Sequence, residues 1–215
     1  MSDKPLWVRK LSRVSSSRRL ASDEFHRNQL RTLLAVDRAV GRIASALRET
    51  GRLDKTVFFF TSDNGLSWGE HRWLDNKICP YEECIRVPFV VVAPGIEART
   101  DPHLVLNLDI GPTLAALAGL AKATDGRNLL PLLENPGAGW REDFLIEYWH
   151  TNMAYAERTF KALRTLRWKY VEYLNGDREL YDLAADPYEL ENRANGPAYT
   201  ELIARLRSRL EELKR

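Results

Sequence analysis

Residues 56–65 read TVFFFTSDNG, a short and unalternated apolar run that ends in a polar turn. A run of this kind is typical of a strand that is covered on both faces. The tetrapeptide Ser62-Asp63-Asn64-Gly65 is a strong turn signal, and it places Asp63 and Asn64 directly after the strand. In an open α/β sheet, ligands bind beyond the carboxyl ends of the strands. These two residues are therefore the first candidates for a functional site.

The segments on either side of this strand continue an alternation of helix and strand. Upstream, residues 27–50 carry aliphatic side chains at steps of three and four, which predicts an amphipathic helix ended by Gly51. Downstream, Phe89–Val92 read as a second buried strand, and a second helix is expected from about Ile110 to Leu120. Helix, strand, strand and helix in this order predict an α/β fold.

The C-terminal third has a different pattern. Short strands are expected at 144–148, 159–163, 168–173 and 179–181, and Asn175-Gly176 is typical of a hairpin turn. A final amphipathic helix carries Leu202, Leu206 and Leu210. We therefore predict three consecutive parts. Residues 1–25 form a polar, locally basic surface arm, residues 26–139 an α/β part, and residues 140–215 a small antiparallel sheet with a closing helix.

The composition is that of a folded globular protein, and it excludes several classes of function. The 215 residues are 44% hydrophobic and 29% charged. Their 32 Lys and Arg nearly balance 30 Asp and Glu, and a net charge of +2 gives no electrostatic basis for binding nucleic acid. No apolar run approaches the roughly 20 residues of a membrane span. We expect Cys79 and Cys84 to be free buried thiols rather than a disulfide or a zinc pair.

The densest group of polar residues follows the first strand, and each member has a structural alternative. Asp63 and Asn64 offer hard oxygen donors that suit calcium or magnesium, although Asp-Asn-Gly is also an ordinary turn. Lys77 could reach an anion, or it could be a solvated loop lysine. His71 could donate a hydrogen bond or a proton near neutral pH, or it could be a packed structural histidine.

These residues belong to an ordered set of short stretches along the chain. The stretches are Thr61-Ser62-Asp63-Asn64-Gly65, Gly69-Glu70-His71, Lys77, Tyr81-Glu82, Ile85-Arg86-Val87-Pro88, Ala93-Pro94-Gly95, Asn107–Leu114, Asp125-Gly126-Arg127, Glu179–Leu183 and Asp186–Asn192. In this order, they resemble the second half of a type I sulfatase, in particular bacterial arylsulfatases similar to N-acetylglucosamine-6-sulfatases. The resemblance implies a sulfuric ester hydrolase with an alkaline-phosphatase-like sheet, of which residues 26–139 are the C-terminal part.

The resemblance also implies roles for single residues. Asp63 and Asn64 would ligate a calcium ion, Lys77 would contact the sulfate group and the bridging ester oxygen, and His71 would be a catalytic or substrate-side residue. The family nucleophile is a formylglycine made within a Cys/Ser-x-Pro-x-Arg motif, which these 215 residues lack. We therefore expect the formylglycine in an absent N-terminal half. A calcium ion takes about six to eight oxygens, so the site should be incomplete and weak, and the chain inactive alone.

Two other functions remain open at this point. The chain could be a non-catalytic, sulfatase-derived module that binds sulfated sugars around Lys77 and His71. It could also be a metal-dependent phosphatase or phosphonate hydrolase of the same fold. Trp149 and His150 follow a strand and could line a sugar-binding edge, or they could pack at the rim of the core.

The strands of a partial sheet would expose edges and apolar faces, so we expect self-association or a partner that covers them. The expected ligand is a sulfated small molecule or sugar. The sequence predicts a soluble protein and favours neither a cytoplasmic nor an exported location.

Overall fold

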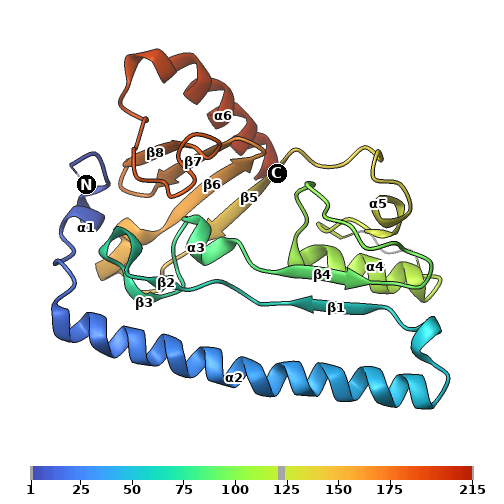
Figure 1. Ribbon diagram of the computed structural model, residues 1–215. Helices are drawn as coiled ribbons and strands as arrows, with labels where there is room; N and C mark the ends of the chain where they lie inside the picture. The colour runs from blue at the N-terminus through green and yellow to red at the C-terminus, as the bar shows by residue number, and fades with distance from the viewer. Residues whose placement is uncertain (1, 121–123, 215) are drawn as a thin grey trace. The chain divides into compact units, whose positions relative to one another are not determined.

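The computed structural model describes residues 2–120 and 124–214 (Figure 1). Their contacts divide the chain into two compact units. Unit 1 comprises Met1–Val14, Asn64–Arg86 and Arg141–Arg215, and unit 2 comprises Ser15–Asp63 and Val87–Trp140. Helices and antiparallel sheets confirm the α/β fold class. The division into three consecutive parts stays a prediction.

Unit 1 is built on a four-stranded sheet in which every neighbouring pair is antiparallel. The predicted hairpin turn is confirmed, because the amide of Gly176 donates to the carbonyl of Tyr173 at 3.0 Å. Gly176 has a φ of 89°, a value that glycine adopts without steric cost. In spatial order, the strands are β5 (Asp143–Tyr148), β6 (Phe160–Thr165), β7 (Trp168–Tyr173) and β8 (Arg178–Asp182).

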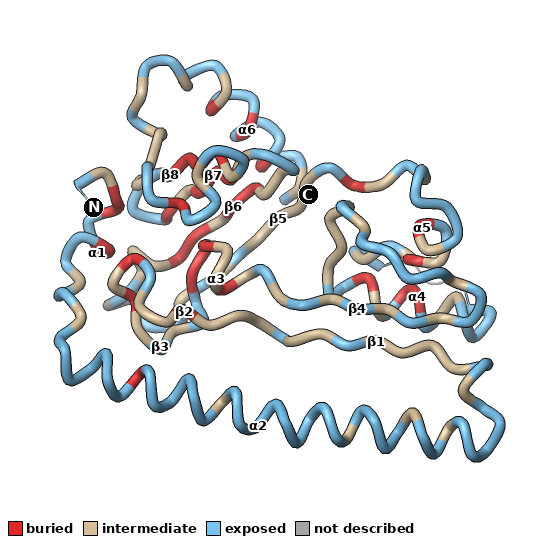
Figure 2. Tube along the Cα trace, viewed as in Figure 1, coloured by how far each residue is buried: buried red, intermediate tan, exposed pale blue. Residues whose placement is uncertain are grey.

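The two faces of this sheet bury different side chains, because successive residues of a strand point to opposite faces. On one face, Leu163 and Tyr170 pack with Leu210 of the closing helix α6 (Thr200–Leu213), as predicted. On the other face, Ala162 and Val171 pack in a cluster with aromatic residues from earlier in the chain. Figure 2 shows the buried residues concentrated along the sheet strands.

The expected surface arm at residues 1–25 is wrong for its first half. The short helix α1 (Leu6–Arg9) carries Trp7 and Val8, which are buried against the sheet of unit 1. The second half begins the long helix α2 (Ser16–Glu49), which therefore starts eleven positions before residue 27. The hydroxyl of its N-cap residue Ser15 accepts from the amide of Arg18 at 3.3 Å.

Residues 64–86 contribute a small irregular layer to unit 1. The strands β2 (Ser67–Trp68) and β3 (Leu74–Asn76) pair antiparallel, and α3 (Glu82–Ile85) follows them. Within this segment, Tyr81 packs against Tyr181 of β8 in a buried cluster. The segment that was expected to carry the site is thus attached to the C-terminal sheet.

Unit 2 contains the two strands that the sequence predicts as buried. β1 (Phe58–Thr61) pairs with β4 (Phe89–Val92) in an antiparallel two-stranded sheet. The expectation that both faces are covered is wrong: Phe60 is 43% exposed and Val90 is 51% exposed. A two-stranded ribbon has two edges and little surface to cover it, so its alternate side chains remain in solvent.

The helices of unit 2 also leave apolar surface uncovered. On α2, Leu33 is 52% exposed and Val40 is 43% exposed, although both lie on the predicted apolar stripe. The unit also contains α4 (Ile110–Leu117) and α5 (Leu130–Glu134). Before α4, the carboxylate of Asp109 accepts from the amides of Leu106 and Arg127. Within the described ranges, no helix is both long and apolar enough to cross a bilayer.

Candidate functional site

Three of the predicted site residues lie in one stretch of unit 1, the site segment, which we define as residues 64–86. These are Asn64, His71 and Lys77. Asp63 is the adjoining last residue of the Ser15–Asp63 stretch of unit 2. Trp149 follows β5 in unit 1.

Lys77 is exposed and lies immediately after β3. Its two neighbours restrain the backbone around it, because the side-chain oxygen of Asn76 accepts from the amide of Ile78 at 2.8 Å. Asn76 also pairs with Ser67 of β2. The lysine therefore projects its ammonium group into solvent from a backbone that is held on its N-terminal side. An exposed ammonium on a fixed backbone is suited to bind an anion.

His71 is buried, with 8% of its surface exposed. Its ring stacks on the ring of Tyr81 at a centroid distance of 3.8 Å, and its φ of 53° places it in the left-handed region. Burial and the nearby charges of Lys4 and Lys169 lower the pKa of His71 to about 3. The imidazole is consequently neutral at physiological pH, and it can exchange hydrogen bonds but cannot act as a cationic acid.

Asp63 and Asn64 supply oxygen donors of the kind that calcium prefers. Asp63 is exposed, and its carboxylate accepts from the hydroxyl of Ser62 at 3.4 Å. The amide nitrogen of Asn64 donates to the carbonyl of Gly65 at 2.9 Å. The described residues contain no group of three or more His, Cys, Asp or Glu that could hold a metal. The donor chemistry fits part of a calcium site and does not complete one.

The other two predicted residues lie close together after β5. Trp149 is 59% exposed, and the ammonium of Lys161 lies 5.1 Å from its ring centroid. His150 is half-buried between the rings of Tyr148 and Tyr155. An exposed indole beside a lysine offers a stacking surface with a positive charge.

The two cysteines of the site segment form a disulfide, so the expectation of free thiols is wrong. The turn at Pro80 and Tyr81 folds the chain back at the start of α3. It brings the Cα atoms of Cys79 and Cys84 to 5.7 Å, which lies within the range that a disulfide requires. Both cysteines are buried.

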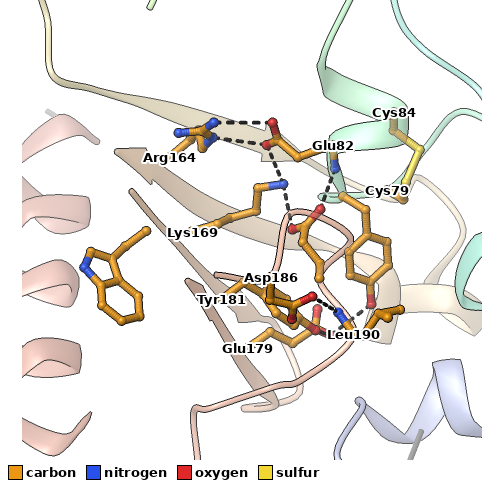
Figure 3. Close-up of polar contacts among 12 residues, drawn as sticks. Cys79, Glu82, Cys84, Arg164, Lys169, Glu179, Tyr181, Asp186 and Leu190 are labelled. Carbon is orange, nitrogen blue, oxygen red and sulfur yellow. Dashed lines mark hydrogen bonds and ion pairs between the residues drawn. A yellow bond between two sulfur atoms is a disulfide. The ribbon is translucent and has the colours of Figure 1, made fainter. Parts of the chain in front are cut away.

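A buried ion network that was not expected from the sequence joins the site segment to the C-terminal sheet. The ammonium of Lys169 lies 2.9 Å from the carboxylate of Glu82 and 2.7 Å from that of Glu189. Glu82 also pairs with Arg164 at 3.1 Å. Figure 3 shows Glu82 between the Lys169 and Arg164 side chains. Burial opposes ionisation of Glu82, but Lys169 and Arg164 outweigh it and hold its pKa below the ordinary value.

A second buried carboxylate lies beneath this network. Glu179 is fully buried and accepts from the hydroxyls of three tyrosines. These are Tyr81 at 2.9 Å, Tyr173 at 2.7 Å and Tyr181 at 2.5 Å. Desolvation by burial raises the pKa of Glu179. Lys4 adds a positive charge at the same place, and its ammonium donates to the hydroxyl of Tyr181 at 2.6 Å.

One signal in the sequence could have indicated this network. Lys169 and Glu179 stand inside strands whose neighbouring residues are aromatic or aliphatic, and a charged residue in such a strand is buried only with a partner. The partner cannot be read from the sequence, because Glu82 and Glu189 lie far from Lys169 along the chain.

Two family models match this chain. The model described as "Sulfatase" matches residues 7–120. The model described as "N-sulphoglucosamine sulphohydrolase, C-terminal" matches residues 69–215. Together they include the site segment and the C-terminal sheet.

Curated relatives agree with the family models. An arylsulfatase of Volvox carteri is 34% identical over 99% of this chain and 37% of its own length. An N-acetylglucosamine-6-O-sulfatase of Bacteroides thetaiotaomicron is 34% identical over 89% of this chain and 36% of its own length. The chain thus spans between a third and two fifths of these relatives.

Solved structures share the fold. One is described as bound to its substrate D-glucosamine-2-N,6-O-disulfate; it has a TM-score of 0.75 and 35% identity over 84% of this chain and 38% of its own. A phosphonate monoester hydrolase of Agrobacterium radiobacter has a TM-score of 0.74 and 31% identity over 83% of this chain and 39% of its own.

Proposed function

Because the chain belongs to the sulfatase family, we propose that it is the C-terminal part of an enzyme that hydrolyses sulfate esters of sugars or aryl alcohols. The observation that carries this proposal is Lys77, an exposed ammonium on a restrained backbone in a segment that the family models match. Relatives at about one third identity are described both as an arylsulfatase and as sulfatases of glucosamine derivatives, so the proposal includes both kinds of ester.

In this proposal, Lys77 binds the sulfate group and stabilises the negative charge that develops on its oxygens and on the bridging oxygen. A fixed cation is effective in this role because it needs little reorganisation when charge appears in the transition state.

His71 is proposed as a second substrate-side residue. Its Nε2 has no hydrogen-bond partner among the described residues. A neutral imidazole can hydrogen-bond a sulfate or hydroxyl oxygen, and its lowered pKa removes the option of general acid catalysis at neutral pH. Because this nitrogen is buried, a direct contact requires that it become accessible.

We further propose that Asp63 and Asn64 supply part of a calcium site. When bound, the ion would neutralise the charge of sulfate oxygens. The donors outside this pair would have to come from water or from residues that this chain does not contain, so binding by the chain alone should be weak. Trp149 and His150 are proposed to line the sugar-binding side, where an exposed indole can stack on a sugar ring.

Isothermal titration of the full chain with N-acetylglucosamine 6-sulfate tests the proposal, with N-acetylglucosamine as the unsulfated control. We expect Lys77→Ala to abolish preference for the sulfated sugar, because the variant removes the charge that recognises sulfate. The matched control is Lys55→Ala, which removes an exposed lysine elsewhere in the chain. Equal affinity of Lys77→Ala and the unmodified chain would overturn the proposal, as would equal affinity for both sugars.

A phosphonate monoester hydrolase is the second candidate, because a protein of that description shares the fold at 31% identity. The same titration with a phosphonate monoester separates the two functions. Tighter binding of the phosphonate than of the sulfated sugar would favour the second candidate.

We also propose that the chain, when alone, associates with a second copy through the apolar face of α2. Large aliphatic side chains such as Leu33 and Val40 are about half exposed there. Burial of such side chains is favourable by about 25 cal/mol per Å² of apolar surface.

A further inference from the structure

Cys84 lies where two parts of the site segment meet. Its side chain is bonded to Cys79, and its carbonyl oxygen accepts from the amide of Gly65 at 2.8 Å. Gly65 directly follows Asn64, and Cys79 lies two residues after Lys77. One buried residue is therefore linked, by a covalent bond and by a hydrogen bond, to the surroundings of both predicted ligand-binding residues.

The hydrogen bond from Gly65 is part of a close backbone approach. A Cβ at position 65 would collide with the carbonyl oxygen of Glu83, so no other residue type fits without displacement of the backbone. Gly65 is needed here for space rather than for its φ angle. The backbone beside Asn64 is thus in direct contact with the loop that the disulfide closes.

The stretch that carries Lys77, just before the loop that the disulfide closes, is restrained in a similar way. Asn76 lies in β3 and accepts from the amide of Ile78 across Lys77, which fixes the lysine backbone on one side. On the other side, the nearest restraint along the chain is the bond of Cys79 to Cys84. Without this bond, the stretch after Ile78 would lose its direct cross-link to Cys84 and would reach the Gly65 contact only through the backbone of residues 80–83.

The loop is anchored to the rest of unit 1. Cys79 and Cys84 pack in one buried cluster with Tyr81 and Tyr181 of β8. The amide of Glu82, inside the loop, donates to the carboxylate of Glu189 at 2.6 Å. The disulfide therefore connects the site residues to a buried, hydrogen-bonded part of unit 1.

We propose that the Cys79–Cys84 disulfide is a positioning element that holds Asn64 and Lys77 in register with each other for binding of a sulfate ester. This proposal rests on the proposed function, because it assigns the purpose of the arrangement to sulfate binding. It predicts that the disulfide contributes to ligand affinity and to local rigidity at Gly65, beyond its contribution to stability.

The test uses the full chain and its Cys79→Ala/Cys84→Ala variant. Titration with N-acetylglucosamine 6-sulfate should show an affinity lower by about threefold to tenfold, as expected when a long side chain must be ordered on binding. Amide hydrogen exchange should accelerate at Gly65 and Ile78 while the amides of β6 and β7 keep their protection.

A dithiol provides a reversible version of the same test. Reduction by dithiothreitol breaks the sulfur–sulfur bond, leaves one thiol on each cysteine and converts the dithiol to its cyclic disulfide. The affinity should fall with reduction and return after the reductant is removed and the protein reoxidised.

A control separates positioning from simple stabilisation. Leu210→Ala removes a fully buried side chain of α6 far along the chain from the site segment, and it should lower stability without a change in affinity. The proposal is overturned if the double cysteine variant binds the sulfated sugar as the unmodified chain does, or if protection at Gly65 is unchanged. If Lys77→Ala and the double cysteine variant both bind the sulfated sugar normally, the proposed function fails together with the positioning role. If Lys77→Ala loses binding and the double cysteine variant does not, only the positioning role of the disulfide is rejected.

Discussion

The hydroxyl of Tyr81 donates to a carboxylate oxygen of Glu179 at 2.9 Å, across a separation of 98 residues. This bond joins the site segment to β8. Both groups are fully buried, so neither can exchange its partner for water. The contribution of this contact to holding the site segment on β8 can therefore be measured as a change in the free energy of unfolding.

Tyr81→Phe should lower the free energy of unfolding by about 1–3 kcal/mol, because it leaves a buried carboxylate with one donor fewer. The phenylalanine ring retains the stack on His71, so the loss reports the hydroxyl alone. Urea unfolding followed by tryptophan fluorescence measures the change. Tyr188→Phe removes a hydroxyl from a side chain that is 68% exposed and should leave stability within error. Equal midpoints for the two variants would contradict this prediction.

Lys169→Met should cost about 3–5 kcal/mol, because it leaves the carboxylates of Glu82 and Glu189 buried without their common cation. The matched control is Lys161→Met on the neighbouring strand. Lys161 pairs with Glu147 at 3.3 Å on a partly exposed surface, and such pairs contribute about 0–1 kcal/mol. Thermal and urea unfolding of both variants give the comparison. Similar losses in both would show that burial of the Lys169 network is unimportant.

His71→Phe should change how stability depends on pH. In the folded chain the pKa of His71 is lowered from 6.5 to about 3, so the unfolded state binds more protons between these values. The stability from this group is therefore fully present above pH 6.5 and is lost as the pH falls toward 3. The advantage of the unmodified chain over His71→Phe should shrink by up to about 1.4 kcal/mol per pH unit as the pH falls through this window.

Glu189 has the opposite dependence, and it provides an internal check. Burial raises its pKa from 4.5 to about 7, so the folded state binds more protons between these values and stability falls as the pH rises through them. In His71→Phe, the loss of stability that Glu189 causes with rising pH is no longer offset by the gain from His71. The variant should therefore lose stability between pH 5 and pH 7. Urea unfolding at pH 4, 5, 6 and 7 measures both effects. A constant difference between the two proteins across this range would refute the assignment of His71.

The apolar face of α2 should cause concentration-dependent self-association of the chain. Leu33→Lys/Val40→Lys places two charges on this face, seven residues apart and hence on the same side of the helix. We expect sedimentation velocity to show a shift toward the monomer for this variant. Leu190→Lys alters a leucine that is 64% exposed in unit 1 and should leave the association unchanged. A monomer at all concentrations for the unmodified chain would be inconsistent with the prediction.

The strands were predictable from the sequence where local pattern determines them. β4 and β7 begin and end where predicted, because their apolar residues are bounded by turn signals such as Asn175-Gly176. The start of α2 was not predictable by periodicity, because residues 16–26 are mostly polar. The structure places its N-cap at Ser15. The exposure of Phe60 could not be predicted either, since a strand sequence does not specify what covers it.

Candidate site residues could be named from the sequence, but the contacts that support them could not. Lys77 and Asn64 were identified by their order in a family-like segment, and their roles remain predictions. The Cys79–Cys84 bond was missed because a spacing of five residues permits a disulfide only if a turn folds the chain back. A packed structural histidine was one of the two alternatives for His71, and its burial against Tyr81 fits that alternative. The charges of Lys4 and Lys169, which help to lower its pKa, could not be assigned to it from the sequence.

Unit 1 is assembled from three stretches of chain, and the ammonium of Lys4 donates to the carbonyl of Glu189, which is 185 positions away. A ribosome releases the chain from its N-terminus, so the first two stretches emerge long before the sheet that they need. Until the last stretch has been synthesised, Trp7 and Tyr81 cannot pack against the sheet that buries them. The partly synthesised chain therefore exposes apolar surface, and we expect pauses late in translation to lower its yield more than pauses early on.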